Sequence, residues 1–339
     1  MEPVMGFDTH LGTFDLVAVD GLDRELTSAT LANTPRGWAE AVAVAAKFGI
    51  TVVGVEGASS YGAALARSLV RAGITVKDVP TRDTAWTRRS QGGSKNDRID
   101  ARAAARAVLA GKGNRWNDAP EMETVRVVSH RRDSLVTEQT RGVNELRALL
   151  VDYDPVAAAR LGRLRSLRAF SALAAVATDP DPHREVIAQL IRDLADDCAR
   201  RLTQIRHLTT RLETLMPEAG QRLITQIDGC GVVTAAIIIA ELAGTDLFAT
   251  EAKFAMWAGA APLDASSGQN LHHRLNRGGN RQVNRALHTI VITQLQHRGE
   301  AADYLTRRRL EGKPRRATLR ACKRHLARRV WKILHNDLT

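Results

Sequence analysis

Residues 4–33 read VMGFDTHLGTFDLVAVDGLDRELTSATLAN and contain three runs that favour β-strands. The runs VMGFDTH, FDLVAVD and ELTSATLAN are rich in Val, Phe, Leu and Thr, and the turn-forming stretches GTF and DGLD separate them. Strands joined by such short turns usually pair with their neighbours in the chain. We therefore predict a three-stranded antiparallel meander over residues 4–33.

The next segments alternate between helix and strand. A helix, a strand, a helix and a strand are predicted in turn, from PRGWAEAVAVAAKFG (35–49), ITVVGVEG (50–57), SYGAALARSLVRAG (60–73) and ITVKDVP (74–80). Pro35 suits a first helical turn, and the nearly all-apolar run 50–57 suits a strand that is buried on both faces. This order of elements is that of the ribonuclease H-like (RuvC-like) fold, which we expect over residues 1–115.

Carboxylates stand at the ends of two of these strands and at the start of a later helix. Asp8 ends the first strand and Glu56 ends the fourth, and in this fold those two strands are neighbours. KNDRIDARAAARA (95–107) carries Asp97 and Asp100, whose spacing puts both on one helical face above the same sheet edge. Taken alone, this pair also suits a first helical turn, where acidic side chains favour the helix dipole.

Four converging carboxylates in one site would repel one another unless cations were bound between them. Two Mg²⁺ or Mn²⁺ ions about 3.5–4 Å apart would neutralise this charge and could clamp the attacking and leaving oxygens of a phosphodiester. The acidic set Asp8, Glu56, Asp97 and Asp100 therefore predicts a two-metal site for strand cleavage.

The composition favours a nucleic-acid partner and a reducing compartment. The chain has 339 residues, a net charge of +12 and a pI near 10.3, as expected for a protein that neutralises phosphates, although a merely basic protein would share these values. Cys198, Cys230 and Cys322 lack metal-like spacing. The start resembles no signal peptide, and the apolar run VVTAAIIIA is too short to span a bilayer. We expect a cytoplasmic protein with no membrane partner.

Several basic segments lie outside the acidic set. The loop TRDTAWTRRSQGGSKN (81–96) places Arg88, Arg89 and Lys95 near Trp86, which suits contact with nucleic acid, or a solvated connection. Residues 116–220 keep helical apolar spacing in two long stretches and predict an antiparallel, coiled-coil-like arm for assembly or strand-holding.

A last domain is expected over 221–339. LITQIDGCGVVTAAIIIAELAG (223–244) resembles a helix-hairpin-helix, in which backbone N–H groups meet a phosphate. The interleaved basic and apolar residues from Arg307 to Lys332 predict one packed basic helix. The expected fold class is thus α/β plus α, with a helical arm and a helical C-terminal domain.

The motifs FDTH, VEGASSYG and KNDRIDARAAARA resemble the Asp-Glu-Asp-Asp (DEDD) signature of the IS110-type family of bacterial insertion-sequence transposases. IDGCGVVTAAIIIAEL, FAMWAGAAPLDASSG and RGGNRQVNRALHTIV resemble the C-terminal transposase domain of that family, which includes Piv-like invertases and bridge-RNA-guided recombinases. The resemblance extends from about residue 5 to residue 335 and keeps the family's order of motifs.

The resemblance implies a catalytic serine just before the glycine of an AP-x₄-SG pattern. In APLDASSG that residue is Ser267, with Ser266 as the neighbouring alternative, whereas SSG by itself is an ordinary turn. The resemblance implies that the serine and the acids act on one phosphate from different protomers, through a phosphoserine link. The basic and amide residues downstream are expected to contact phosphate: Arg274, Arg277, Asn280, Arg281 and Arg285.

The leading hypothesis is a transposase, a metal-dependent DNA recombinase that exchanges strands through a serine nucleophile. By resemblance its partners are donor and target double-stranded DNA, a noncoding bridge RNA as guide, and further copies of itself in a dimer or tetramer. The alternative is a metal-dependent Holliday-junction or structure-specific endonuclease that forms no covalent intermediate. A third hypothesis, a nucleic-acid-binding protein without enzymatic activity, leaves the acidic set unexplained.

Overall fold

The computed structural model describes residues 2–79, 97–160, 164–175, 178–244, 248–264, 273–274, 276 and 278–335. The chain divides into two compact units, one formed by residues 1–123 with 242–249, the other by 124–241 with 250–339. The domain boundaries expected from the sequence, at 115 and 220, stay a prediction.

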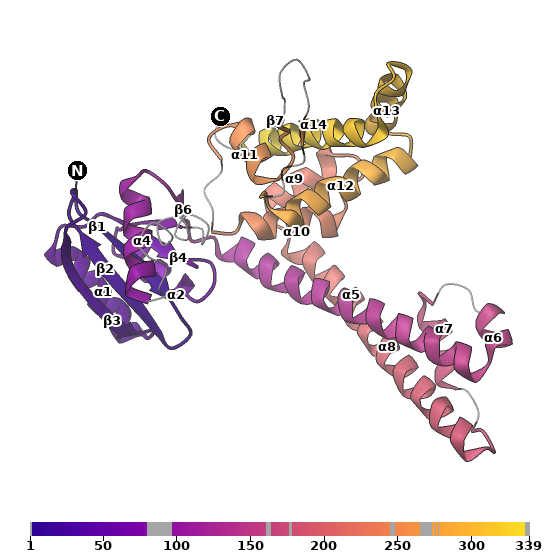
Figure 1. The fold of residues 1–339 in the computed structure, drawn as a ribbon. Helices are drawn as coiled ribbons and strands as arrows, with labels where there is room; N and C mark the ends of the chain where they lie inside the picture. The colour runs from indigo at the N-terminus through magenta and orange to yellow at the C-terminus, as the bar shows by residue number, and fades with distance from the viewer. Residues whose placement is uncertain are drawn as a thin grey trace. The chain divides into compact units, whose positions relative to one another are not determined.

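The first unit is built on a six-stranded sheet (Figure 1). Its strands are β1 (Val4–Thr9), β2 (Thr13–Val19), β3 (Glu25–Ala32), β4 (Val52–Glu56), β5 (Thr75–Asp78) and β6 (Asn114–Arg115), and they lie in the order β3-β2-β1-β4-β5-β6. The pairs β1–β2, β2–β3 and β5–β6 are antiparallel, whereas β1–β4 and β4–β5 are parallel. The predicted meander and the ribonuclease H-like order are confirmed, and β6 adds a short edge strand that was not predicted.

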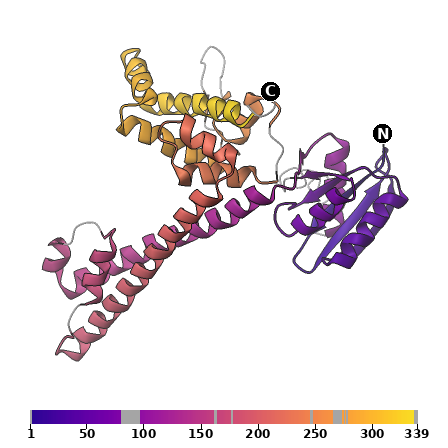
Figure 2. The same ribbon diagram turned by 180° about the vertical axis from the view of Figure 1, so that it is seen from behind.

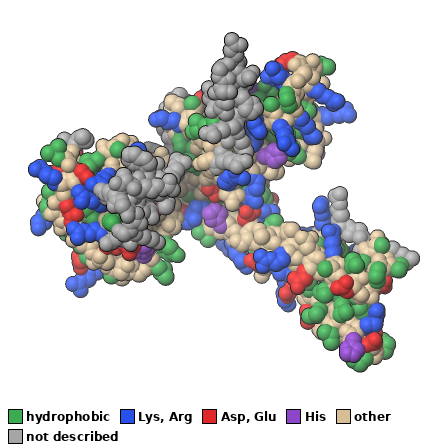
Figure 3. Space-filling view, viewed as in Figure 1, with side chains coloured by type: hydrophobic (Ala, Val, Ile, Leu, Met, Phe, Trp, Pro, Cys, Tyr) green, Lys and Arg blue, Asp and Glu red, His purple; other side chains and the backbone are tan. Residues whose placement is uncertain are grey.

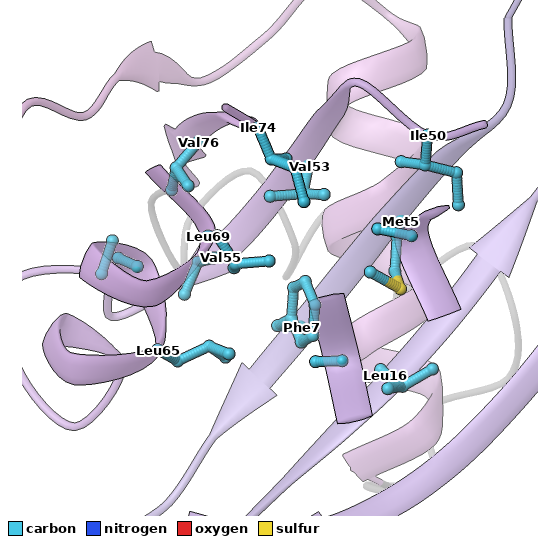
Figure 4. Close-up of a cluster of buried hydrophobic side chains, with 14 of the residues drawn as sticks. Met5, Phe7, Leu16, Ile50, Val53, Val55, Leu65, Leu69, Ile74 and Val76 are labelled. Atoms are coloured by element: carbon cyan, nitrogen blue, oxygen red, sulfur yellow. The ribbon is translucent and has the colours of Figure 1, made fainter. Parts of the chain in front are cut away.

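Helices cover both faces of this sheet. On one face α1 (Pro35–Lys47) and α2 (Ala63–Arg71) enclose an apolar core, whose side chains converge in Figure 4. Both helices end as predicted, because Gly49 and Gly73 just beyond them take positive φ angles of 62° and 81°. The other face packs against α4 (Asp97–Leu109) through a smaller core of valine and alanine side chains.

The second unit begins with the predicted helical arm. It contains α5 (Pro120–Tyr153), α6 (Pro155–Arg160), α7 (Leu167–Ala174) and α8 (Pro182–Leu215), and both views show α5 and α8 side by side (Figures 1 and 2). They run antiparallel, since Arg132 of α5 donates to Thr209 Oγ1 of α8 and Gly142 lies against Arg201. Leu146, Leu150, Phe170 and Ile191 contribute to the arm's core, which α7 helps to close.

The remaining helices pack together at the C-terminal end of the chain. They are α9 (Glu218–Gln226), α10 (Val232–Leu242), α11 (Glu251–Trp257), α12 (Arg281–Gln296), α13 (Glu300–Leu310) and α14 (Arg315–His335), with the short pair β7 (Leu263–Asp264) and β8 (His273–Arg274). The prediction of one basic helix from Arg307 to Lys332 is wrong. The chain breaks between α13 and α14, because Gly312 takes a positive φ of 74° and Pro314 lacks the N–H that a continuous helix requires.

Within the described ranges, no helix has the length and apolar character needed to cross a membrane.

Candidate active site

Asp8 and Glu56 lie side by side on the two central strands of the sheet. They are register partners in the parallel β1–β4 pair. Side chains alternate between the faces of a strand, so Asp8 points to the same face as Gly6, opposite to Met5 and Phe7 of the larger core. The face that carries both acids is therefore the face that α4 covers.

A pair of glycines lets α4 approach the sheet closely. Gly6 and Gly54 are register partners two residues before Asp8 and Glu56. A Cβ atom on Gly6 would lie 2.1 Å from the carbonyl oxygen of Ala101, and one on Gly54 would lie 2.8 Å from that of Ala104. The helix backbone thus rests on strand backbone, and this short distance brings the first turn of α4 to the acidic edge.

The first turn of α4 supplies Asp97 and Asp100, as the sequence predicts. Asp100 is 4% exposed and Asp8 is 8% exposed, so both carboxyl groups are withdrawn from water. The side chain of Asp97 is half exposed. Glu56 is the register partner of Asp8, and the charges of Glu56, Asp97 and Asp100 all act on the Asp8 carboxyl group, so we call these four acids the carboxylate cluster (Asp8, Glu56, Asp97 and Asp100).

Arginines of α4 hold the helix in this position from its other side. Arg102 donates to the backbone oxygen of Asp23 at 2.7 Å, and Arg106 Nε lies 2.7 Å from Asp23 Oδ2. Arg98, one turn earlier, pairs with Glu25. These basic residues of the KNDRIDARAAARA motif bind Asp23 in the turn between β2 and β3 and Glu25 at the start of β3.

His10 completes the cluster and was missed by the sequence analysis as a site residue. Its Nε2 lies 3.5 Å from Asp8 Oδ2 and 3.4 Å from Asp97 Oδ2. One ligand atom from each of these three residues fits within a span of 4.8 Å, a grouping able to hold a metal ion. The available signal was its position in FDTH, two residues after Asp8 and just beyond the end of β1.

The electrostatics of the cluster favour a bound cation. The pKa of Asp8 is raised from 3.8 to about 6. Burial is the largest cause, the nearby carboxylates of Glu56, Asp100 and Asp97 contribute to the increase, and His10 opposes it. Oε2 of Glu56 is buried and has no hydrogen-bond partner among the described residues. Buried carboxylate oxygens without donors are hard ligands of the kind that Mg²⁺ and Mn²⁺ prefer, so the residues present fit such an ion.

A fifth acid supports the cluster from the next strand. Asp78 Oδ1 of β5 accepts a hydrogen bond of 3.2 Å from the backbone N–H of Ala58, in the turn that follows Glu56. Burial raises the pKa of Asp78, and the charge of Glu56 adds to the increase. Asp78 thus fixes the turn after Glu56 without entering the acidic motif.

Several predicted contact residues lie outside the described residues, namely Ser266, Ser267, Arg88, Arg89, Lys95 and Arg277. The ends of the serine segment are nevertheless defined by the β7–β8 pair, in which Asp264 is opposite His273 and Leu263 is opposite Arg274.

The predicted residues at the start of α12 lie close together. Asn280 caps the helix, because its Oδ1 accepts from the N–H groups of Gln282 and Val283, and its Nδ2 donates to Glu241 Oε2 at 2.6 Å. Arg285 pairs with Asp133 at 2.7 Å, whereas Arg281 is exposed. The contact of these residues with phosphate stays a prediction. The structure shows a different role for Asn280, which caps α12.

Two family models match this chain. A DEDD-type IS110 transposase model matches residues 5–155, and a model described as "Transposase IS116/IS110/IS902 family" matches residues 221–306. The first range contains the whole carboxylate cluster and the second contains Ser266, Ser267 and the start of α12.

Among curated proteins, the chain is similar to an uncharacterised 43.6 kDa protein of insertion element IS110 from Streptomyces coelicolor. The two are 27% identical over 341 residues, which cover 86% of this chain and 82% of that protein. A probable family 20 transposase of Pseudomonas aeruginosa is 25% identical, over 72% of this chain and 73% of its own. Among solved structures, Thermus thermophilus RuvC bound to a Holliday junction matches 33% of this chain and 95% of its own, with 17% identity and a TM-score of 0.27.

Proposed function

This chain belongs to the IS110 family of insertion-sequence transposases, and from that premise we propose how it cuts and rejoins DNA. Membership in this family makes it a DNA-cleaving enzyme, and the acidic grouping at Asp8, His10 and Asp97 supports the use of divalent metal ions. The finer proposal is that the carboxylate cluster holds two ions, Mg²⁺ or Mn²⁺, and that Ser267 is the nucleophile. Ser266 is the alternative.

One observation carries this proposal: four carboxylates meet on the central strands and α4, and burial and mutual repulsion raise the pKa of Asp8 to about 6. A cluster so costly to charge in the free protein is suited to binding cations. Bound divalent ions would neutralise it and stabilise the charge that develops on the phosphate oxygens.

The protein's own residues have distinct tasks in this scheme. Asp8 and Glu56 anchor the cation site on rigid strands, and α4 adds Asp97 and Asp100. Ser267 Oγ attacks the phosphorus of one phosphodiester, the bond from phosphorus to the leaving deoxyribose oxygen breaks, and the serine proton passes to that oxygen. In the rejoining step a strand hydroxyl attacks the phosphorus of the serine-linked strand, the bond from phosphorus to Oγ breaks, and the hydroxyl proton passes to Oγ, so one phosphodiester bond is exchanged for another.

The test is the fate of a labelled DNA strand on a denaturing gel. The wild-type protein should give a protein-linked strand, and Ser267→Ala should abolish both this adduct and recombination while DNA binding is retained. Ser266→Ala is the matched control and should have much less effect. Recombination by Ser267→Ala but not by Ser266→Ala would move the nucleophile by one residue.

Cleavage by both serine variants would instead favour the alternative function. The chain would then act as a metal-dependent Holliday-junction or structure-specific endonuclease, with water in place of the serine. No structural observation favours that function over the transposase.

DNA is the substrate that membership in the transposase family supports, and two further partners are proposed. A noncoding bridge RNA would guide the choice of donor and target, and the chain would act as a dimer or tetramer. RNA extracted from the purified protein should contain one discrete species that is encoded beside the transposase gene. A preparation that recombines DNA after complete removal of RNA would exclude the guide.

A further inference from the structure

A basic cavity of about 530 Å³ lies in the second unit, beside the first half of α12 and against α14. Arg281, Arg285 and His288 line it from α12, where their spacing puts them on one face of the helix. Asn284 and Lys323 line its inner part. Lys and Arg side chains are also numerous on the C-terminal helices in the space-filling view (Figure 3).

Lys323 is the unusual member of this lining. The residue is only 8% exposed, although lysine is seldom buried. Its Nζ donates to Asn284 Oδ1 at 2.8 Å, and the amide is held in this orientation because Asn284 Nδ2 donates to the carbonyl oxygens of Ala258 and Gly259. The hydrogen-bond partner of Lys323 is thus the uncharged amide of Asn284, whose orientation the backbone fixes. The ammonium group has further N–H donors for a ligand.

The charges around Lys323 are positive. Burial lowers its pKa, and the guanidinium groups of Arg320 and Arg281 lower it further. Within the part of the chain that the structure describes, no carboxylate pairs with Lys323, Arg281 or Arg320, and the nearby Arg285 is the one neutralised by Asp133. A buried cation without a counterion costs free energy, which an anionic ligand would offset.

We propose that this cavity, the Lys323 cavity, binds one phosphate group of the DNA backbone through the ammonium of Lys323 and the guanidinium of Arg281. A phosphate has several acceptor oxygens and can bond to cations from two helices at once. Gly279 and Gln282, at the N-terminal and positive end of α12, also line the cavity. The inference deepens the function proposed above, since it assigns a holding point for the same DNA, but it requires neither Ser267 nor cleavage.

The first test measures binding of a DNA duplex in EDTA, where cleavage does not interfere, over a series of salt concentrations. Lys323→Met keeps the apolar stem and removes the charge, and it should lower the slope of log K against log salt by about one. Arg281→Met, at an exposed position, should have a similar effect and guards against a folding defect in the buried variant. An unchanged slope in both variants would overturn the proposal.

The second test uses inorganic phosphate and needs no DNA. Phosphate should raise the melting temperature of the wild-type protein above its value in chloride of equal ionic strength, and Lys323→Met should lose this shift. Lys253→Met, which removes an exposed lysine of α11 outside the cavity, is the control and should retain it. Without phosphate, Lys323→Met should melt at the same or a higher temperature, because a buried charge has been removed.

If phosphate raised the melting temperature equally in the wild type, Lys323→Met and Lys253→Met, the role of Lys323 would be structural and not in phosphate binding. Weaker binding of an RNA duplex by Lys323→Met, with DNA binding unchanged, would overturn the assignment to DNA. Loss of adduct formation by Ser267→Ala bears on the proposed reaction alone, because neither of these tests depends on it.

Discussion

At the scale of single residues, the environment of Asp8 disfavours the charged form of its carboxyl group. Its carboxyl group is buried beside three other acids, and its pKa is about 6 as a result. Folding therefore makes Asp8 bind its proton more tightly than in the unfolded chain, where its pKa is near 3.8. The folded protein gains stability from this group at low pH and loses it as the pH rises from about 4 to about 6.

Asp8→Asn should consequently stabilise the metal-free protein while abolishing strand cleavage. At pH 7 in EDTA we expect its free energy of unfolding to increase by about 1–3 kcal/mol, because one pKa unit corresponds to about 1.4 kcal/mol. The difference in free energy of unfolding between Asp8→Asn and the wild type should decrease towards pH 4. The stabilisation of the wild type by Mn²⁺ should decrease over the same pH range. Denaturant unfolding at several pH values measures both, with the exposed Asp152→Asn as control. A destabilised Asp8→Asn protein at pH 7 would contradict the electrostatic account.

Gly6 is a residue whose importance lies in the side chain it lacks. Gly6→Ala should destabilise the first unit by about 1–3 kcal/mol, because its Cβ would strike the backbone of α4 at Ala101 and Ala105. Displacement of α4 should also weaken Mn²⁺ binding, measured by calorimetry, even though every carboxylate remains. Gly12→Ala, where nothing lies within 4 Å of the new Cβ, should change neither quantity. Normal Mn²⁺ affinity in Gly6→Ala would mean that the position of α4 is unimportant for the cluster.

At the scale of elements, α4 is positioned from both sides. Its alanine face rests on the glycine pair of β1 and β4, and its arginines bind the turn between β2 and β3. The alanines at 101, 104 and 105 are small enough for this approach, and they also favour the helix. A carboxylate on a helix held in this way has little freedom to move.

Asp23→Asn tests this anchor. The variant keeps a residue that tolerates the positive φ of 64° at this position but removes the charge that Arg102 and Arg106 contact. We expect the free energy of unfolding to fall by about 1 kcal/mol and Mn²⁺ to bind more weakly. Thermal melts measure the first change and calorimetry the second. Glu40→Gln removes an exposed ion pair with Arg36 on α1 and should leave Mn²⁺ binding unaltered. Equal effects of the two variants on Mn²⁺ affinity would argue against a positioning role for Asp23.

At the scale of the whole molecule, the proposed chemistry is divided between the two units. The carboxylate cluster belongs to the first unit, whereas the serine segment and the Lys323 cavity belong to the second. Such a division permits one reaction to draw its acids and its serine from different protomers of an oligomer.

Mixed oligomers show whether the serine and the acids of one site come from different protomers or from the same chain. A mixture of Ser267→Ala and Asp100→Asn chains should recover part of the recombination activity if serine and acids come from different protomers, because some sites then contain neither substitution. If both come from one chain, every site in the mixture carries a defect and activity should stay absent. Recombination of a labelled plasmid pair, with each variant alone as control, provides the measurement.

The sequence by itself predicts the order of strands and helices in the first unit, because the period of two in strands and the caps of helices are local patterns. It also predicts that Asp8, Glu56, Asp97 and Asp100 belong together, since the order of elements is that of the ribonuclease H-like fold, in which the first and fourth strands are neighbours. The prediction of one continuous basic helix overlooked the break at Gly312, because the basic and apolar spacing continues on both sides of it, although Gly312 and Pro314 are themselves local signals for a helix end.

Only the tertiary structure reveals what depends on distances between segments far apart in the chain. The contact of Gly6 with α4, the approach of His10 to Asp97 and the burial of Lys323 behind Asn284 are such features. Each joins elements whose separation is set by the packing of whole helices and sheets. A sequence pattern fixes which face a residue occupies, but the width of the gap opposite that face depends on every side chain that fills it.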